Sequence, residues 1–455
     1  MSKTATIGFY GGVGSVTGAN FLLDTGGCKV LIDCGLVQGN RFALDVNAAD
    51  FPYDPKSISA LIVTHAHADH IGRIPKLVRD GFRGTIYSTL PTFDLASVML
   101  RDAYHIMRSE ADARGEKPLY AESDIDRALS MWRDVPYRRR IAVGDGLHIL
   151  LRDAGHILGS AFVECTRGRR KIVFSGDIGN VPQLLLNPPD IPEDYHYLVM
   201  ESVYGDRAHE KVDERSSLLL DHIKDTIEQQ GTLIIPAFSL ERTQGMLFEI
   251  NNFVEEGLIE PIPTFLDSPL AIEVTELYRR HAQYLKKDVQ EQIKRGDDIF
   301  DFPKLRFTRH VTDSRDIVKV PGPKIIIAGS GMSHGGRIRM HEKQYLGERT
   351  TTVLLVGYQA VGSMGRLLQD GAKRVRIDGK EVTVRARIAT ITGYSGHADR
   401  DQLVEFVAHG GANVEQVFVT MGEEKASLFL VQRLHDFLGV NAVAPEVGSV
   451  LPIDF

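Results

Sequence analysis

Short apolar runs separated by glycine-rich turns characterise the first 65 residues of the chain. Residues 21–23 and 30–32 form two such runs, and the turn sequence DTGGCK between them predicts an antiparallel hairpin. An apolar run at 60–63 predicts a buried strand, and residues 71–79 after it predict a helix. The residues between this strand and this helix therefore lie in a loop on a rigid scaffold, where functional side chains are common.

The apolar pattern changes in the middle third of the chain. Before it, helices are predicted at 92–114 and 123–133, and hairpin-like strands at 147–151, 161–166 and 171–175. Predicted helices then alternate with strands, with helices at 210–230, 241–256 and 271–295 and strands at 232–237, 263–269 and 323–331. Such alternation predicts a parallel sheet. We therefore expect a separate α/β domain here, with hairpin-like strands resuming near residue 382.

Length and composition favour two domains without a membrane segment. The chain has 455 residues, 43% of them hydrophobic, and a single hydrophobic core rarely serves more than about 300 residues. No apolar run approaches the roughly 20 residues that span a bilayer, and the opening sequence MSKTATIGFYGG lacks the apolar region of a signal peptide. Three cysteines without CxxC spacing fit a reducing compartment and argue against a thiolate zinc site. A cytoplasmic protein is expected.

Charge alone does not predict a nucleic-acid partner. The net charge is −7, so a polyanion would have to be bound by local basic clusters. Such clusters occur at 138–140, 167–171 and 373–376, although most runs of this kind are only solvated faces.

The glycine-rich sequence GGVGSVTG at 11–18 has the spacing of a dinucleotide-binding turn, with Asp33 about 20 residues later. Such a turn must open a helix that crosses over to a parallel strand. Here the residues after Gly18 run directly into a strand and a tight turn. We therefore exclude nucleotide binding at this position.

The sequence THAHADH at 64–70 places His65, His67, Asp69 and His70 in the loop after the predicted strand at 60–63. Neutral imidazole and carboxylate are ligands that suit Zn²⁺ and similar cations. One cation takes about four ligands, and these side chains together with others from elsewhere cannot all converge on one point. Two neighbouring cations are therefore expected.

Further ligands are expected from other loops that follow strands. His156, Asp177 and His397 are each flanked by glycine or other small residues, which permit close approach. Each of them alone is more often a turn residue than a ligand, but the dense histidine cluster makes a metal site the better interpretation. Asp33 is expected to accept an N–H from a ligating histidine and so fix its tautomer, rather than merely to cap the hairpin strand.

With these residues assembled, the chain resembles the metallo-β-lactamase-fold hydrolases. More narrowly it resembles their β-CASP branch, the RNA-processing nucleases related to the pre-mRNA 3′-end cleavage factor, and especially the bacterial and archaeal homologues. The segments that carry the resemblance cover nearly the whole chain in the family's order: MESVYGDRAH, IPAFSLERTQ, LDSPLA, AGSGMSHGGR, VGYQAVGSMGR and GYSGHADRDQL. The resemblance implies an αββα sandwich at 1–205 and 369–455, with an inserted α/β β-CASP domain at 206–368 that holds a parallel sheet flanked by helices.

The resemblance also implies roles for individual residues. One zinc ion would be held by His65, His67 and His156, and a second by Asp69, His70 and His397. Asp177 would bridge the two ions, and Mn²⁺ or iron could replace zinc. The implied catalytic residues are Asp69, Asp177, Glu201 and His397. The RNA phosphates would be bound by the backbone of the SGMSHGG loop and by Ser333, Arg337, Ser363 and Arg366.

The activity implied by the resemblance is endonucleolytic hydrolysis of single-stranded RNA, with 5′ exonuclease action as a further expectation. Two zinc ions would lower the pKa of a shared water from about 15.7 toward ~7, and the resulting hydroxide would attack phosphorus. Asp69 or Asp177 would accept its proton. A homodimer is expected by analogy.

Two positions depart from the family pattern. Leu367 replaces a histidine thought to pair with the acid that matches Glu201 and to protonate the leaving group, so the general acid is left open, with His334 and His341 as weaker candidates. Met421 replaces the histidine of an HGE sequence, which is not a metal ligand in the family. A change in local hydrogen bonding is expected there, without loss of metal.

Three other functions compete with a ribonuclease: a DNA nuclease, a thioester or lactam hydrolase of the same fold, and a non-catalytic RNA-binding subunit. The inserted domain argues against small-molecule hydrolases, whose site is open. The complete set of candidate ligands argues against a non-catalytic subunit. DNA stays open as a substrate, because the contacts to the 2′-hydroxyl that distinguish RNA from DNA cannot be read from a sequence.

Overall fold

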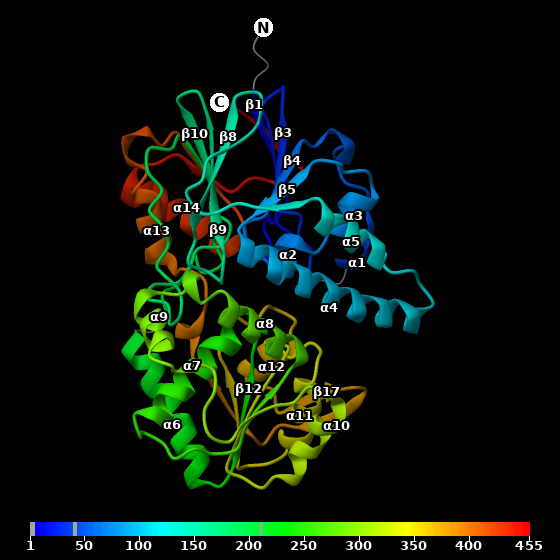
Figure 1. Ribbon diagram of the computed structural model, residues 1–455, viewed down its shortest axis with the longest axis vertical. Coiled ribbons are helices and arrows are strands. Elements are labelled where there is room, and N and C mark those ends of the chain that lie inside the picture. The colour runs from blue at the N-terminus through cyan, green and yellow to red at the C-terminus, as the bar shows by residue number, and fades with distance from the viewer. Residues whose placement is uncertain (1–4, 40–42, 210–211) are drawn as a thin grey trace. The chain divides into compact units, whose positions relative to one another are not determined.

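The computed structural model describes residues 5–39, 43–209 and 212–455 (Figure 1). The chain forms two compact units, with Met1–Ala208 and His397–Phe455 in unit 1 and His209–Gly396 in unit 2. The sequence places the second boundary after residue 368, whereas the structure places it after Gly396. The reason is that β19 (Arg387–Thr390) pairs in parallel with β16 (Thr351–Leu355) and so belongs to the sheet of unit 2.

The first sheet of unit 1 has the strand order β22-β1-β2-β3-β4-β5-β6. The predicted hairpin is confirmed as β2 and β3, in which Leu23 lies opposite Val30. Because β1 runs antiparallel to β2 with no helix between them, the glycine-rich turn at 11–18 is not a dinucleotide-binding turn. The strands are β1 (Ala5–Gly11), β2 (Asn20–Asp24), β3 (Lys29–Ile32), β4 (Ala60–Ile62), β5 (Thr85–Ser88), β6 (Trp132–Asp134) and β22 (Val450–Ile453).

The second sheet of unit 1 has the order β21-β20-β11-β10-β9-β8-β7. The hairpin-like strands predicted between residues 147 and 175 form its antiparallel part, and β11 and β20 extend it in parallel. The strands are β7 (Ile141–Gly144), β8 (Leu147–Asp153), β9 (Ala161–Arg167), β10 (Arg170–Phe174), β11 (Tyr197–Met200), β20 (Gln416–Val419) and β21 (Ala442–Val443).

Helices cover the outer faces of the two sheets, so that unit 1 is the expected αββα sandwich. Figure 1 shows the helices between residues 43 and 130 beside the first sheet, and the C-terminal helices beside the second. The first group is α1 (Ala43–Ala48), α2 (Ala68–Ile71), α3 (Ile74–Arg79), α4 (Leu90–Arg114) and α5 (Glu122–Ser130), and the second is α13 (Arg400–Ala408) and α14 (Glu424–Leu438).

Two predicted helices of unit 1 differ from the structure. The helix predicted at 71–79 is divided, because Gly72 ends α2 before α3 begins at Ile74. The helix predicted at 123–133 ends at Ser130, because Trp132 and its neighbours pair with β5 as strand β6. Strand pairing, which local periodicity does not record, decides this end.

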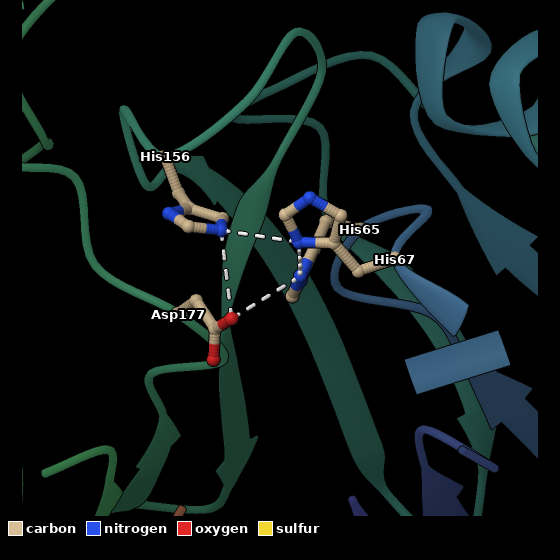
Figure 2. A group of neighbouring side chains, drawn as sticks. All are labelled: His65, His67, His156 and Asp177. Carbon is tan, nitrogen blue, oxygen red and sulfur yellow. Dashed lines mark hydrogen bonds and ion pairs between the residues drawn. The ribbon is translucent and has the colours of Figure 1, made fainter. Parts of the chain in front are cut away.

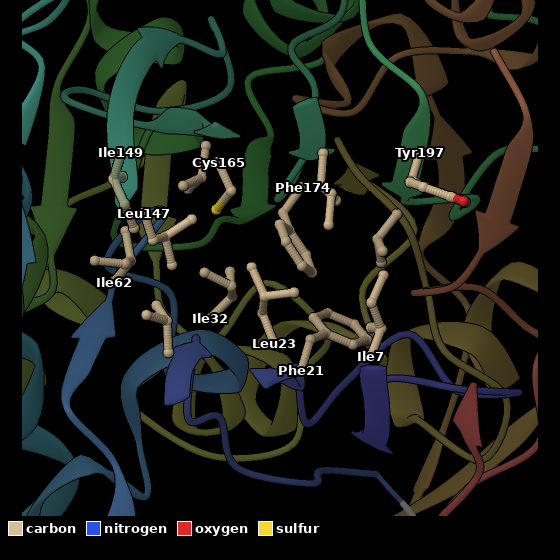
Figure 3. Packing of buried hydrophobic residues seen from close by; sticks show 14 of the residues in the cluster. Ile7, Phe21, Leu23, Ile32, Ile62, Leu147, Ile149, Cys165, Phe174 and Tyr197 are labelled. Atoms are coloured by element: carbon tan, nitrogen blue, oxygen red, sulfur yellow. The ribbon is translucent and has the colours of Figure 1, made fainter. Parts of the chain in front are cut away.

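The core of unit 1 lies between the two sheets. Figure 3 shows Phe21, Leu23, Ile32 and Ile62 of the first sheet facing residues of the second, among them Phe174. The rings of Phe21 and Phe174 meet with their centroids 6.5 Å apart. Burial of these apolar side chains holds the sheets face to face and fixes where the loops at their edges emerge.

Unit 2 contains the predicted parallel sheet, with the order β14-β13-β15-β12-β16-β19 and every neighbouring pair parallel. Its further strands are β12 (Thr232–Pro236), β13 (Thr264–Asp267), β14 (Leu305–Phe307) and β15 (Lys324–Ala328). A separate antiparallel hairpin, β17 (Arg374–Ile377) and β18 (Lys380–Thr383), precedes β19. The strands expected near residue 382 thus begin earlier, at Arg374, and comprise this hairpin and one parallel strand, β19.

Helices lie on both sides of the parallel sheet of unit 2 in Figure 1. The predicted helix at 271–295 is divided into α8 and α9, and the predicted helix at 210–230 is described from Val212, since residues 210 and 211 lie outside the described residues. The helices are α6 (Val212–Glu228), α7 (Arg242–Glu255), α8 (Pro269–Arg280), α9 (Lys287–Lys294), α10 (Val311–Asp316), α11 (Ile338–Tyr345) and α12 (Met364–Gln369). None of the described helices is long and apolar enough to cross a membrane.

Substitution of Phe174 by alanine tests the core of unit 1. Phe174 is 1% exposed between the sheets, so Phe174→Ala should lower the free energy of unfolding by about 3–5 kcal/mol. The fluorescence of Trp132, the single tryptophan of the chain, reports unfolding of unit 1 in urea. Phe437 is 66% exposed on α14, and Phe437→Ala should change this free energy by no more than about 0.5 kcal/mol. Equal effects of the two substitutions would contradict this core.

Candidate metal centre

Loops at one edge of the two sheets of unit 1 carry the predicted ligands. His65 and His67 lie between β4 and α2, and Asp69 and His70 lie in the single turn of α2. The other ligands follow strands or precede a helix: His156 lies between β8 and β9, Asp177 follows β10, and His397 precedes α13. The structure therefore gathers residues that are more than 300 positions apart in the sequence.

Three imidazoles and one carboxylate converge in the first group of side chains, His65, His67, His156 and Asp177 (Figure 2). The Nδ1 atom of His67 lies 3.1 Å from Nε2 of His65 and 3.3 Å from Nε2 of His156. Asp177 Oδ2 lies 3.3 Å from His65 Nε2 and 3.5 Å from His156 Nε2. One ligand atom from each residue lies within 4.8 Å of all the others.

A second group shares Asp177 and adds Glu201 and His397. The Nδ1 atom of His397 lies 3.2 Å from Glu201 Oε2 and 3.9 Å from Asp177 Oδ2. The backbone holds these residues in place, because the N–H of Ala398 donates to the carbonyl of Ile178 at 2.7 Å. In turn, the N–H of Ile178 donates to Glu201 Oε1 at 2.6 Å.

Asp69 and His70, predicted as ligands of a second cation, lie beside Asp177. His70 Nε2 is 3.4 Å from Asp177 Oδ1 and 3.8 Å from Asp69 Oδ2. Its Nδ1 is 2.7 Å from Asp33 Oδ2, so Asp33 occupies the orienting position predicted for it. Glu201 was not expected to be a metal ligand, but it belongs to the same group of candidate ligands as His397.

The donor atoms at this site fit a divalent cation. His70 Nε2 and Asp177 Oδ1 are buried and have no hydrogen-bond partner among the described residues. Leaving such atoms unsatisfied costs about 1–3 kcal/mol each. Both belong to a cluster of nitrogen and oxygen donors, the ligands that Zn²⁺ and similar metals prefer. Cations at this position would satisfy both atoms.

Burial and charge set the protonation of these groups. Burial lowers the pKa of His65, His67 and His156, which favours the neutral imidazoles that bind metals. Burial raises the pKa of Asp177, but the neighbouring His70 and His65 outweigh burial and hold it well below its usual value. The cluster is therefore organised around one ionised carboxylate.

Glycines permit the close approach of the loops in this cluster. The N–H of Gly179 donates to the carbonyl of Ala154 at 2.8 Å, and a Cβ on Gly179 would lie 2.0 Å from the carbonyl oxygen of Gly155. No side chain fits at that position without displacing the backbone. Gly179 therefore allows the loops that carry His156 and Asp177 to touch.

Thr64 is a site residue that sequence reasoning missed. Its N–H donates to Asp33 Oδ1 at 2.8 Å, and its hydroxyl lies 2.7 Å from Asp33 Oδ2 and 3.0 Å from His65 Nδ1. Thr64 is the first residue of THAHADH, but a pattern of metal ligands does not include it, because a neutral hydroxyl is not a usual zinc ligand.

The residues predicted to bind RNA lie in unit 2, and several are engaged within that unit. Ser333 is buried and its hydroxyl donates to Glu342. Ser363 caps α12 by accepting the N–H of Arg366 at 3.0 Å. Arg366 is partly exposed, with 37% of its side chain accessible and 3.0 Å between its Nε and a carboxylate oxygen of Asp370. Of these side chains, Arg366 is therefore the one that faces solvent.

Arg337, the fourth predicted RNA contact, binds a buried carboxylate at the end of β13. Its Nη1 donates to Asp267 Oδ1 at 2.7 Å and to the carbonyl of Thr308 at 2.8 Å. His341 Nε2 lies 2.7 Å from Asp267 Oδ2. Burial raises the pKa of Asp267, but its hydrogen bonds to His341 and other residues outweigh burial and lower the pKa to about 2. Arg337 and His341 thus anchor α11 to β13.

The two positions that depart from the family pattern differ in burial. Leu367 is 51% exposed on α12. Met421 is buried, its N–H donates to the carbonyl of Gly12 at 2.6 Å, and a Cβ on Gly12 would meet its sulfur. The Met421 side chain is therefore packed against the turn after β1.

Three family models match the chain in sequence order. Residues 22–193 match the metallo-β-lactamase superfamily domain, residues 243–368 the β-CASP domain, and residues 381–445 the Zn-dependent metallo-hydrolase RNA specificity domain. The first lies within unit 1, and the second within unit 2.

Relatives match along nearly the full chain. Ribonuclease TTHA0252 of Thermus thermophilus is 36% identical, over 98% of this chain and 99% of its own. Transcription termination factor FttA of Pyrococcus horikoshii is 32% identical, over 98% of this chain and 70% of its own. A crystal structure of a protein of unknown function from Enterococcus faecalis V583 has the same fold, with a TM-score of 0.57 at 13% identity over 99% of this chain and 100% of that one.

The order of the matched domains agrees with the αββα sandwich of unit 1, the parallel sheet of unit 2 and the cluster of histidines and aspartates at the sheet edge. The identity of 36% to the Thermus ribonuclease over 98% of this chain supports the same family. The chain therefore belongs to the β-CASP branch of the metallo-β-lactamase superfamily.

Proposed function

We propose that this protein is a metal-dependent ribonuclease that hydrolyses phosphodiester bonds in single-stranded RNA and holds two zinc ions in unit 1. The observation that carries the proposal is the position of Asp177, whose carboxylate belongs to both groups of candidate ligands. A shared carboxylate is what a pair of neighbouring cations requires. The names of the Thermus ribonuclease and of the archaeal termination factor support RNA as the substrate.

Cations bound at the cluster would lower the pKa of a water molecule to give a nucleophile near neutral pH, and would offset charge on the phosphoryl oxygens. The first ion would be held by His65, His67, His156 and Asp177, and the second by Asp177 with Asp69, His70 and His397. Mn²⁺ or iron would suit the same donors.

Asp69 and Glu201 are suited to proton transfer. Burial raises the pKa of Asp69 and the pKa of Glu201, although neighbouring histidines oppose the shift. A carboxylate whose pKa is raised accepts a proton more readily near neutral pH. Asp69 lies beside the cluster and would take the proton of the attacking water. Glu201, whose carboxylate lies 3.2 Å from His397 Nδ1, would accept a second proton close to Asp177.

The loops at the carboxyl ends of the strands of unit 2 would bind the RNA backbone. In open parallel sheets, ligands bind at this end of the strands. In the loop after β15, the N–H groups of Ser330, Ser333, His334 and Gly335 are bound within the loop, so the other N–H groups of GSGMSHGG would contact the RNA. The loop after β16 leads to the partly exposed Arg366. Arg337 would act indirectly, because its bonds to Asp267 and Thr308 hold the start of α11 against β13. Phosphate contacts of this kind position a strand without selecting its sequence.

Metal removal should abolish RNA cleavage. End-labelled single-stranded RNA, the matched duplex and the matched DNA are incubated with untreated protein, with protein dialysed against a chelator, and with dialysed protein given Zn²⁺ or Mn²⁺. We expect cleavage of the single-stranded RNA alone, lost on dialysis and restored by metal. Cleavage that persists in the metal-free protein would contradict the proposal, and equal cleavage of DNA would change the substrate.

Asp177→Asn should remove the shared carboxylate while keeping its size. The expected result is loss of bound metal and a fall in kcat of at least about 100-fold. Bound metal per chain is measured by elemental analysis alongside the cleavage rate. Asp145→Asn is the matched control, because Asp145 also lies in unit 1 but binds Thr25 and Arg167. A variant at Asp177 with normal metal content and rate would refute the bridging role.

Arg366 and Arg337 should differ in what their loss affects. Arg366→Ala should raise KM and reduce the salt dependence of RNA binding by about one ion, without a change in stability. Arg337→Ala leaves the buried Asp267 without one of its partners, and should destabilise unit 2 by about 3 kcal/mol or more. Titrations of RNA binding at several salt concentrations, together with thermal unfolding, separate the two effects. The opposite pattern would make Arg337 the RNA contact.

A further inference from the structure

Thr64 connects the loops that carry the candidate ligands. Its backbone N–H and its hydroxyl both bind Asp33, at 2.8 and 2.7 Å, while its carbonyl accepts the N–H of Ala161 at 2.8 Å. Ala161 begins β9, directly after the loop that contains His156. A Cβ on Gly176 would lie 2.8 Å from the Cβ of Thr64, so the threonine side chain also packs against the loop of Asp177.

The hydroxyl of Thr64 has one proton and three polar neighbours. It lies 2.7 Å from Asp33 Oδ2, 3.0 Å from His65 Nδ1 and 3.4 Å from His70 Nδ1. An ionised carboxylate can only accept hydrogen bonds, so the hydroxyl donates its proton to Asp33. Its lone pairs then remain as acceptors, and His65 must supply an N–H from Nδ1.

His70 meets the same carboxylate directly. Its Nδ1 lies 2.7 Å from Asp33 Oδ2, so it too carries a proton on Nδ1. With Nδ1 of both rings acting as donors, Nε2 of His65 and Nε2 of His70 are the nitrogens left to bind a cation. These are the atoms that lie 3.3 and 3.4 Å from the two oxygens of Asp177.

We propose that Thr64 is a positioning residue that relays the orientation of one carboxylate, Asp33, to two ligand histidines. Its hydroxyl fixes the tautomer of His65 as Asp33 fixes that of His70, so that both rings direct Nε2 toward the cations. The inference rests on the metal site of the proposed function. It goes beyond that site because it assigns a role in metal affinity to a residue that is not a ligand.

The tautomer of His65 is the direct test, and it needs no metal. In metal-free protein labelled with ¹⁵N, long-range correlations between ring protons and nitrogens show which nitrogen carries the proton, and His65→Gln assigns the ring. We expect a protonated Nδ1 and an unprotonated Nε2 in the wild-type protein. A proton on Nε2 would overturn the inference, whether or not any variant folds.

Substitutions at Thr64 separate the hydroxyl from packing. Thr64→Val keeps the branched shape and removes the hydroxyl, whereas Thr64→Ser keeps the hydroxyl. Loss of a residue that orients a ligand typically weakens metal binding by about 10- to 100-fold. We therefore expect Thr64→Val to bind Zn²⁺ about 10-fold or more weakly in titration calorimetry and to show both His65 tautomers. Thr64→Ser should bind like the wild-type protein.

Thr25→Val is the matched control, because Thr25 is also buried in unit 1 and its hydroxyl also binds an aspartate, Asp145, at 2.8 Å. It should leave Zn²⁺ affinity unchanged. Thr64→Val with wild-type affinity and tautomer would overturn the inference, and so would equal losses in Thr64→Val and Thr64→Ser. If the wild-type protein binds no Zn²⁺, the proposed function fails, while the tautomer of His65 still decides the role of Thr64.

Discussion

One buried carboxylate, that of Asp177, holds the centre of unit 1 together. It is almost fully removed from solvent, and desolvation of an unpaired carboxylate costs several kcal/mol. The ring nitrogens of His65, His70 and His156 lie 3.3 to 3.5 Å from its oxygens, so that a cation held between them would offset this cost. Since these rings come from loops on both sheets, the loops must meet for the carboxylate to be stabilised.

The sheets make this meeting possible because each loop leaves a strand at the same edge of the sandwich. The core between the sheets fixes the strands, and backbone bonds then tie loop to loop. The N–H of Gly179 binds the carbonyl of Ala154, and the N–H of Ala398 binds the carbonyl of Ile178. His397 follows unit 2 in the sequence, so the last side chain of the cluster arrives only when the chain has returned to unit 1. Side chains held in this way are preorganised, which is what a catalytic metal site requires.

Unit 2 also contains a buried carboxylate, but different groups surround it. Asp267, at the end of β13, is buried and bound by Arg337, His341 and two hydroxyl groups, from Thr308 and Ser314. In unit 1, His70 Nε2 and Asp177 Oδ1 have no hydrogen-bond partner among the described residues. In unit 2, by contrast, both oxygens of Asp267 accept hydrogen bonds. This difference explains why the first cluster suits cations and the second holds a loop and a helix in place. A basic residue in a family motif, such as Arg337, can therefore stabilise the fold as well as bind substrate.

The sequence by itself determined the class of the fold and most of the chemistry of the centre. Alternation of strands and helices predicted the parallel sheet of unit 2, and the spacing in THAHADH predicted a metal cluster, because periodicity and ligand density are local properties. Tertiary structure decided what depends on distant partners. Pairing with β5 turned the predicted end of a helix at Trp132 into a strand, and pairing with β16 assigned residues 387–390 to unit 2. The roles of Thr64 and Arg337 depend on which carboxylate folding brings to each, and no local pattern contains that information.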